Sequence, residues 1–141
     1  MRIGRWIIAA LVLVYALQNL LLAVYLTSLK FGWTHIGADT IRFAPLVHAT
    51  SVVQIAAWWV ALSLMGVATW RLVRNKPALI VFSVAIVLSV ATWLSLKLAQ
   101  GYTRAFDAGE QRFDYVLLAL LVVLGASIWI IERNETRQTG V

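Results

Sequence analysis

This chain of 141 residues carries a net charge of +6 and contains no cysteine, which excludes disulfides, thiolate metal sites and cysteine nucleophiles. Hydrophobic residues make up 62% of it and charged residues 13%, against about 45–50% and about 25% in soluble proteins. Four long apolar stretches contain no Asp or Glu, and so short a chain has nothing with which to cover four such helices in water. We therefore predict an all-α integral membrane protein with one membrane domain, residues 1–141.

The four predicted spans follow from the roughly 20 apolar residues that a helix needs to cross a bilayer. They cover approximately Trp6–Leu26, Leu46–Trp70, Pro77–Leu96 and Tyr115–Ile131. The basic start and apolar run of the first span resemble a secretory signal peptide. However, the run is too long for one and no small-x-small cleavage site follows it, so we expect a retained helix. Before the third span, Asn75 and Pro77 suit the start of a helix.

The two connections on the outer side are longer than most links between neighbouring helices. In the second connection, aromatic residues and a glycine recur at i, i+4, i+7 and i+11, namely Tyr102, Phe106, Gly109 and Phe113. This spacing predicts a short interfacial helix that turns its aromatic side chains toward the lipid. The alternative is a plain loop that touches the headgroups.

The distribution of basic residues predicts the topology. Seven lie at one set of span ends and five at the other: Arg2, Arg5, Arg71, Arg74, Lys76, Arg133 and Arg137 against Lys30, Arg42, Lys97, Arg104 and Arg112. The positive-inside rule then places both termini in the cytoplasm. We predict an N-in/C-in bundle in the cytoplasmic (inner) membrane of a bacterium. The bacterial origin is inferred from size and style and from no motif.

A weak internal repeat emerges when the chain is offset by 70 residues. The offset pairs Arg42–Phe43 with Arg112–Phe113, Val52–Val53 with Val122–Val123, and Trp59 with Trp129. Such a repeat predicts two helical hairpins of the same orientation, related by an axis along the membrane normal. Chance matching between apolar sequences is the alternative explanation.

Polar residues at membrane depth are the candidate functional residues, because they are costly there unless they are satisfied. The predicted cluster comprises Gln18 and Asn19 in the first span, His48, Gln54 and Trp58 in the second, and Ser89 and Thr92 in the third. These residues predict either a ligand site or hydrogen bonds between helices. The second interpretation is favoured, since such bonds commonly join membrane helices and contribute about 0.6–2 kcal/mol each.

We expect no cofactor, no metal and no catalytic residue. The only histidines are His35, in a loop, and His48, near a helix end, and one chain cannot readily bring them together on a haem; two copies of His48 in a homodimer are the remaining arrangement. No phosphate-binding glycine loop, zinc-binding helix motif or nucleophile elbow occurs. Because no span contains an acid, proton coupling through a buried carboxylate is also excluded. Lys97 is expected to reach the headgroups.

The hypothesis for function is a non-enzymatic accessory or scaffold subunit that associates, within the lipid bilayer, with other membrane proteins or with itself as a homo-oligomer. Its specific residues are Trp58 and Trp59, one of which is expected to face outward. Nucleic acid is not an expected partner, because the basic residues lie at span ends. Two alternatives stay open. One is a small carrier or channel for a neutral or amphipathic molecule, and the other is a lipid- or quinone-binding protein that uses His48.

Overall fold

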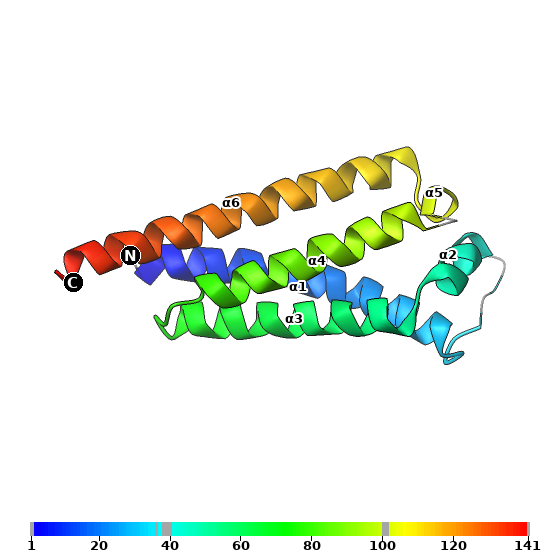
Figure 1. Ribbon diagram of the computed structural model, residues 1–141, viewed down its shortest axis with the longest axis horizontal. Helices are drawn as coiled ribbons and strands as arrows, with labels where there is room; N and C mark the ends of the chain where they lie inside the picture. Colours follow the sequence, from blue (N-terminus) through cyan, green and yellow to red (C-terminus); the bar gives the residue numbers. More distant parts are fainter. Residues whose placement is uncertain (1, 36, 38–40, 100–101, 141) are drawn as a thin grey trace.

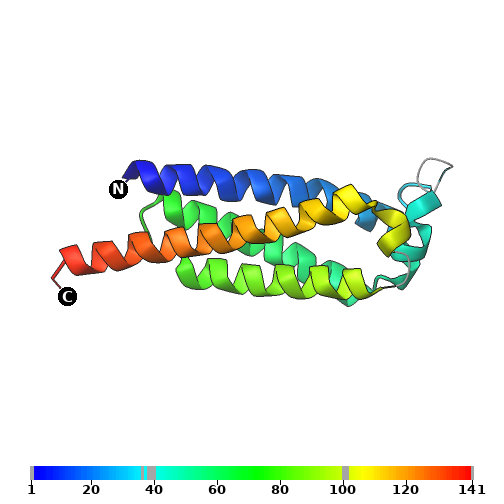
Figure 2. The same cartoon turned by 90° about the horizontal axis from the view of Figure 1, so that it is seen from above.

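The computed structural model describes residues 2–35, 37, 41–99 and 102–140. Within these residues, every regular element is a helix. Four long helices pack side by side (Figure 1, Figure 2): α1 (Arg2–Lys30), α3 (Val52–Val73), α4 (Leu79–Leu98) and α6 (Ala108–Gln138). Each of them is long and apolar enough to cross a membrane. The prediction of an all-α chain with four potential membrane spans is therefore confirmed.

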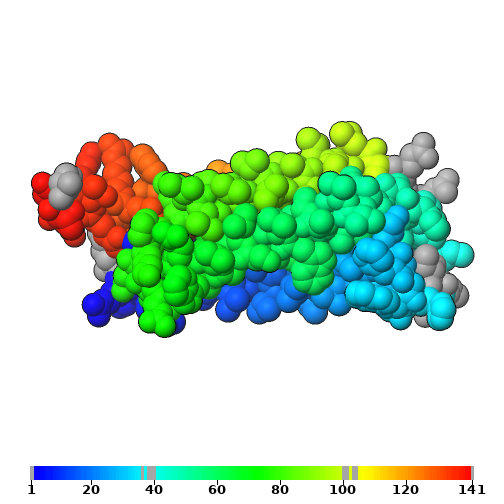
Figure 3. All heavy atoms as spheres, turned by 60° about the horizontal axis from the view of Figure 1, so that its bottom comes forward, coloured from blue at the N-terminus to red at the C-terminus, as the bar shows by residue number. Residues whose placement is uncertain are grey.

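The two ends of the molecule differ in character. Both chain termini and the turn between α3 and α4 lie at one end, which we call the terminal end (Figure 1). The opposite end, which we call the loop end, carries three short elements: η1 (Ile41–Phe43), α2 (Ala44–Ala49) and α5 (Tyr102–Ala105). Figure 3 shows α1, α3 and α4 as one closely packed face, past which the C-terminal part of α6 projects.

The core consists of two clusters of buried side chains. One lies between the four long helices and includes Val12, Met65, Phe82 and Ile128, and the other lies toward the loop end. Fully buried alanines such as Ala61 allow the helix backbones to approach closely. Most of the remaining surface of the four helices is apolar and exposed, as is expected where lipid covers a protein.

The second predicted span, Leu46–Trp70, is in fact two helices. Ser51 is extended, and its hydroxyl accepts a hydrogen bond from the Gln54 backbone N–H at 3.1 Å. In return the Gln54 side-chain oxygen accepts from the Ser51 backbone N–H at 2.7 Å. This capping box begins α3 at Val52. His48 therefore lies on the separate helix α2.

A short helix does lie in the second outer connection, but it does not extend through residues 102–113 as predicted. Helix α5 ends at Ala105, and Asp107 begins α6 with a second capping box. The Asp107 carboxylate accepts from the Glu110 N–H at 2.7 Å, and the Glu110 carboxylate accepts from the Asp107 N–H at 2.8 Å. The regular aromatic spacing thus crosses a helix boundary. As a result α6 begins earlier than its predicted span, and Asp114 lies in its second turn.

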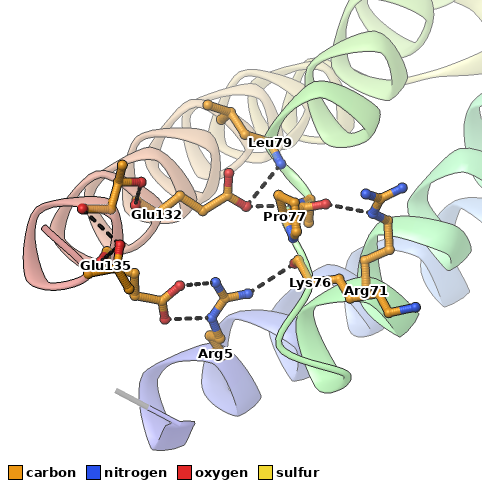
Figure 4. A network of polar contacts seen from close by, with 10 residues as sticks. Arg5, Arg71, Lys76, Pro77, Leu79, Glu132 and Glu135 are labelled. Atoms are coloured by element: carbon orange, nitrogen blue, oxygen red, sulfur yellow. Dashed lines mark hydrogen bonds and ion pairs between the residues drawn. The ribbon is translucent and has the colours of Figure 1, made fainter. Parts of the chain in front are cut away.

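The turn between α3 and α4 also differs from expectation. Asn75 has a φ of 54°, a left-handed conformation that suits an asparagine just after a helix end. It therefore ends α3, and α4 begins only after Ala78, whose side chain cannot cap a helix. A carboxylate oxygen of Glu132 on α6 accepts from the N–H groups of Ala78 and Leu79, at 2.6 and 3.2 Å (Figure 4). Glu132 thus caps α4 from a neighbouring helix.

Positions that the 70-residue repeat pairs have different surroundings. Trp59 is half-buried and donates from its indole N–H to the Thr27 hydroxyl at 3.0 Å. Trp129 is exposed and lies beneath the Arg133 guanidinium, 5.0 Å from its carbon to the ring centre. The repeat and the two equivalent hairpins stay a prediction.

Candidate functional site

A cavity of about 80 Å³ lies among the four long helices and α5, toward the loop end. Its wall is mostly aromatic and aliphatic, with a few polar groups. The aromatic members are Tyr15, Trp58, Trp93, Tyr102 and Phe106, and the polar ones are Asn19, Ser89, Thr92 and Asp114. Four residues of the predicted polar cluster, Asn19, Trp58, Ser89 and Thr92, are therefore brought together at one place.

The helices place these polar groups in register. Ser89 and Thr92 are three residues apart on α4 and share one face of it. Across the cavity, Tyr15 and Asn19 are four residues apart on α1, and the Asn19 amide donates to the Tyr15 carbonyl oxygen at 3.0 Å. Trp58 is buried between them and the loop end. The cavity is thus an apolar space with hydroxyl and amide groups on opposite walls.

Asp114 is the charged residue in the described wall of this cavity. The Tyr102 hydroxyl of α5 donates a hydrogen bond to its Oδ2. Burial, and then this hydrogen bond, raise the pKa of Tyr102 above its usual value, so the phenol is held in its protonated, donor form. The predicted apolar span Tyr115–Ile131 contains no acid, but α6 begins at Ala108, so the half-buried Asp114 lies on the same helix one residue before that span. The exclusion of a buried carboxylate mechanism considered only the spans and does not extend to Asp114.

Trp93 contributes a polar group without a partner. Its indole N–H is buried in the wall and has no acceptor in hydrogen-bonding geometry, although the Tyr102 hydroxyl is near. Lys97, which was expected to reach the headgroups, places its ammonium 4.9 Å from the Trp93 ring centre and donates to the Tyr115 hydroxyl. A buried donor left unsatisfied costs about 1–3 kcal/mol. A bound ligand that accepts a hydrogen bond from the Trp93 N–H would remove this cost.

A groove of about 410 Å³ between α1 and α6 adjoins the cavity. The two hollows share five lining residues, Asn19, Leu22, Phe106, Asp114 and Leu117. Gln18 lines the groove and not the cavity. Because α1 and α6 are both membrane-length helices, this groove is a side opening through which the cavity meets the space around the bundle.

Two residues of the predicted cluster lie elsewhere. The Gln54 amide donates to the Ser95 hydroxyl at 2.9 Å and so links α3 to α4, which is the interhelical role that the sequence favoured. His48 is exposed on α2 and lines neither hollow. Of the two adjacent tryptophans, Trp58 is buried, and Trp59 is half-buried with its indole N–H donated to Thr27. Trp59 is therefore the residue of the accessory-subunit hypothesis that keeps some exposed surface.

A second polar cluster joins three elements at the terminal end (Figure 4). Arg5 of α1 is 2% exposed. Its Nε donates to Glu135 of α6 at 2.9 Å, its Nη2 pairs with the other carboxylate oxygen, and its Nη1 donates to the Lys76 carbonyl oxygen at 3.1 Å. Arg71 donates to the Pro77 carbonyl oxygen at 2.5 Å. We assign this cluster a structural role, because its buried cation is already paired. From the sequence, the basic residues of this cluster were used only to predict the topology.

Among the described residues, no group of three or more His, Asp or Glu side chains could hold a metal ion. Comparisons of the chain with models of protein families, with curated proteins and with solved structures find no match. What the site can do is therefore inferred from its own side chains.

Proposed function

We propose that this chain is a four-helix membrane protein that binds an amphipathic small molecule in the cavity, as a binding protein or carrier and not as an enzyme. The observation that carries the proposal is the cavity itself, with its mostly apolar and aromatic wall and its few polar groups, among them the buried Trp93 N–H, which has no acceptor in hydrogen-bonding geometry. Ligand sites are typically hollows of this kind, in which apolar walls take up the body of the ligand and a few polar groups orient it.

The groove between α1 and α6 supports an amphipathic ligand over a water-soluble one. A molecule that enters between two membrane-length helices comes from the bilayer, where amphipathic compounds concentrate. Its apolar part would lie along Leu22 and Leu117, and its polar part would reach Asn19 and Asp114 where groove and cavity meet.

The test is native mass spectrometry of the protein purified from its own membranes in mild detergent, with a visible spectrum of the same sample. We expect a stoichiometric small molecule. Ser89→Leu fills the cavity and should reduce the occupancy at least about tenfold, which corresponds to about 1.4 kcal/mol. Ser83→Leu is the matched control, because Ser83 is exposed on the same helix. A wild-type protein without a bound molecule, or equal occupancy in both variants, would refute the proposal.

The proposed orientation places both termini in the cytoplasm of a bacterial inner membrane and the loop end outside, as the positive-inside rule indicates. Since the chain has no cysteine, single cysteines report topology without interference. Thr34→Cys at the loop end should react with a membrane-impermeant maleimide in intact cells. Thr139→Cys at the terminal end should react only after permeabilisation, and the reverse pattern would invert the orientation.

The accessory-subunit role remains a second candidate, with one observation in its favour. The last turns of α6 project past the other helices (Figure 2, Figure 3), and there Arg133 and Arg137 are exposed. A partner protein could bind this basic end. The same mass spectrum distinguishes the two candidates, because a subunit would carry a stoichiometric protein. That protein should dissociate more readily from Arg137→Glu.

A further inference from the structure

We propose that the ligand of the cavity is an organic ammonium ion that also carries a hydrogen-bond acceptor, with its positive group against Asp114 and its acceptor at the Trp93 N–H. This inference rests on the proposed function, since it assumes that the cavity is a binding site. It adds the charge and the polar chemistry of the molecule bound there.

The first argument is that no cation among the described side chains pairs with Asp114. One of its oxygens accepts from the Tyr102 hydroxyl. Among the side chains that the structure describes, the ion pairs are Arg5–Glu135 and Arg42–Glu110, so no described cation pairs with Asp114. Lys97 is engaged by the rings of Trp93 and Tyr115. A half-buried carboxylate in an apolar wall is costly unless a positive group accompanies it.

The second argument is the aromatic lining. Rings of Tyr15, Trp58 and Phe106 surround the same space, and the negative faces of aromatic rings attract cations, most strongly where water is excluded. A neutral ligand such as a quinone would satisfy Trp93 but would bring no positive charge to Asp114, whose described partner is the neutral Tyr102 hydroxyl. An anionic ligand would face both the carboxylate and the ring faces unfavourably. The Asp114 carboxylate and the aromatic ring faces therefore both favour a positively charged ligand.

The third argument is the position of Asp114 at the junction of groove and cavity. A cation that approaches through the groove meets Asp114 before it reaches the deeper wall. Trp93 lines the cavity and not the groove. A ligand on this path therefore meets two polar contacts in order. Its positive group reaches Asp114 first, and its acceptor reaches the Trp93 N–H second.

The test compares two probes of the same shape. Benzoylcholine carries a quaternary ammonium group and an ester acceptor, and 3,3-dimethylbutyl benzoate replaces the charged nitrogen by carbon. Binding of each to the purified full chain is measured by equilibrium dialysis, and each variant is compared with wild type for the same probe, so that partition into detergent cancels. Asp114→Asn keeps an acceptor for Tyr102. We expect it to weaken benzoylcholine about tenfold or more and the neutral ester less than about twofold.

The variants separate the roles. Trp93→Phe should weaken both probes, because both contain the ester, and Ser89→Leu should block both. Asp107→Asn is the matched control for charge: it removes a carboxylate from the same end of α6 that lines neither hollow, and asparagine also suits the N-cap position. It should leave benzoylcholine binding unchanged.

The outcomes that overturn the inference differ from those that overturn the proposed function. Equal effects of Asp114→Asn on the two probes, an effect of Asp107→Asn on benzoylcholine as large as that of Asp114→Asn, or no binding of benzoylcholine by wild type would each refute a cationic ligand. The proposed function would survive any of these results if the protein still co-purifies with a small molecule that Ser89→Leu excludes. Unchanged circular dichroism and melting temperature of each variant exclude misfolding as the cause.

Discussion

The Arg5–Glu135 pair gives the sharpest stability prediction. Arg5 is 2% exposed and the Glu135 side chain is 35% exposed, so Glu135→Gln would leave a buried guanidinium with a weaker, neutral partner. Removing one member of a buried ion pair costs about 3–5 kcal/mol, and a hydrogen bond to a charged group contributes about 1.5–3 kcal/mol. Glutamine keeps one acceptor, and water reaches the carboxylate. We therefore expect the free energy of unfolding to fall by about 2 kcal/mol.

Reversible unfolding of the detergent-solubilised protein by increasing mole fractions of SDS, followed by circular dichroism, measures this loss. The control is Arg42→Met, which breaks the other ion pair of the described chain. There the nearest nitrogen and oxygen are 3.7 Å apart and the two side chains are 49% and 42% exposed. Exposed pairs contribute about 0.2–1 kcal/mol. If Glu135→Gln costs no more than Arg42→Met, the pair does not hold the terminal end together.

Two further predictions concern helix starts. Glu132→Ala frees the N–H groups of Ala78 and Leu79, so it should lower stability by about 1–3 kcal/mol and speed hydrogen exchange at those two amides; unchanged exchange would mean that water caps α4 as well. Ser51→Ala removes half of the capping box at α3 and should cost about 1 kcal/mol in the same SDS titration, whereas Ser63→Ala, on the exposed face of α3, should cost much less.

The apolar stretches were sufficient to predict four membrane-length helices, because length and hydropathy alone decide that property. The helix boundaries needed a local signal that periodicity does not contain. Both Ser51-Val-Val-Gln54 and Asp107-Ala-Gly-Glu110 have the spacing of a capping box. These two motifs would have predicted a helix start at Val52, inside the second span, and another at Ala108, inside the aromatic pattern of the second outer connection. The aromatic residues at 102–113 do recur at helical spacing in the sequence, but they lie on two different helices and the turn between them.

The candidate site was predicted in part. Asn19, Ser89 and Thr92 were found because polar residues inside apolar stretches are conspicuous. Asp114 was not among the candidate residues because it precedes the apolar run, and its place in the wall depends on where α6 begins. Tyr102 reaches the site only because α5 folds back toward α6. That contact is tertiary, and no local pattern encodes it.

The capping of α4 by Glu132 has a consequence for how the protein is made. Residues of α4 leave the ribosome before Glu132 does, so a nascent chain can form the α3–α4 hairpin but cannot yet satisfy its N-terminal amides. Arg5 stays without its partner for longer still, since Glu135 lies 130 residues later in the chain. During synthesis the first three long helices can therefore already pack closely against one another, but the N-terminal amides of α4 and the Arg5 guanidinium stay without these partners until α6 is inserted. Chains that stall before Glu132 would keep these polar groups unsatisfied.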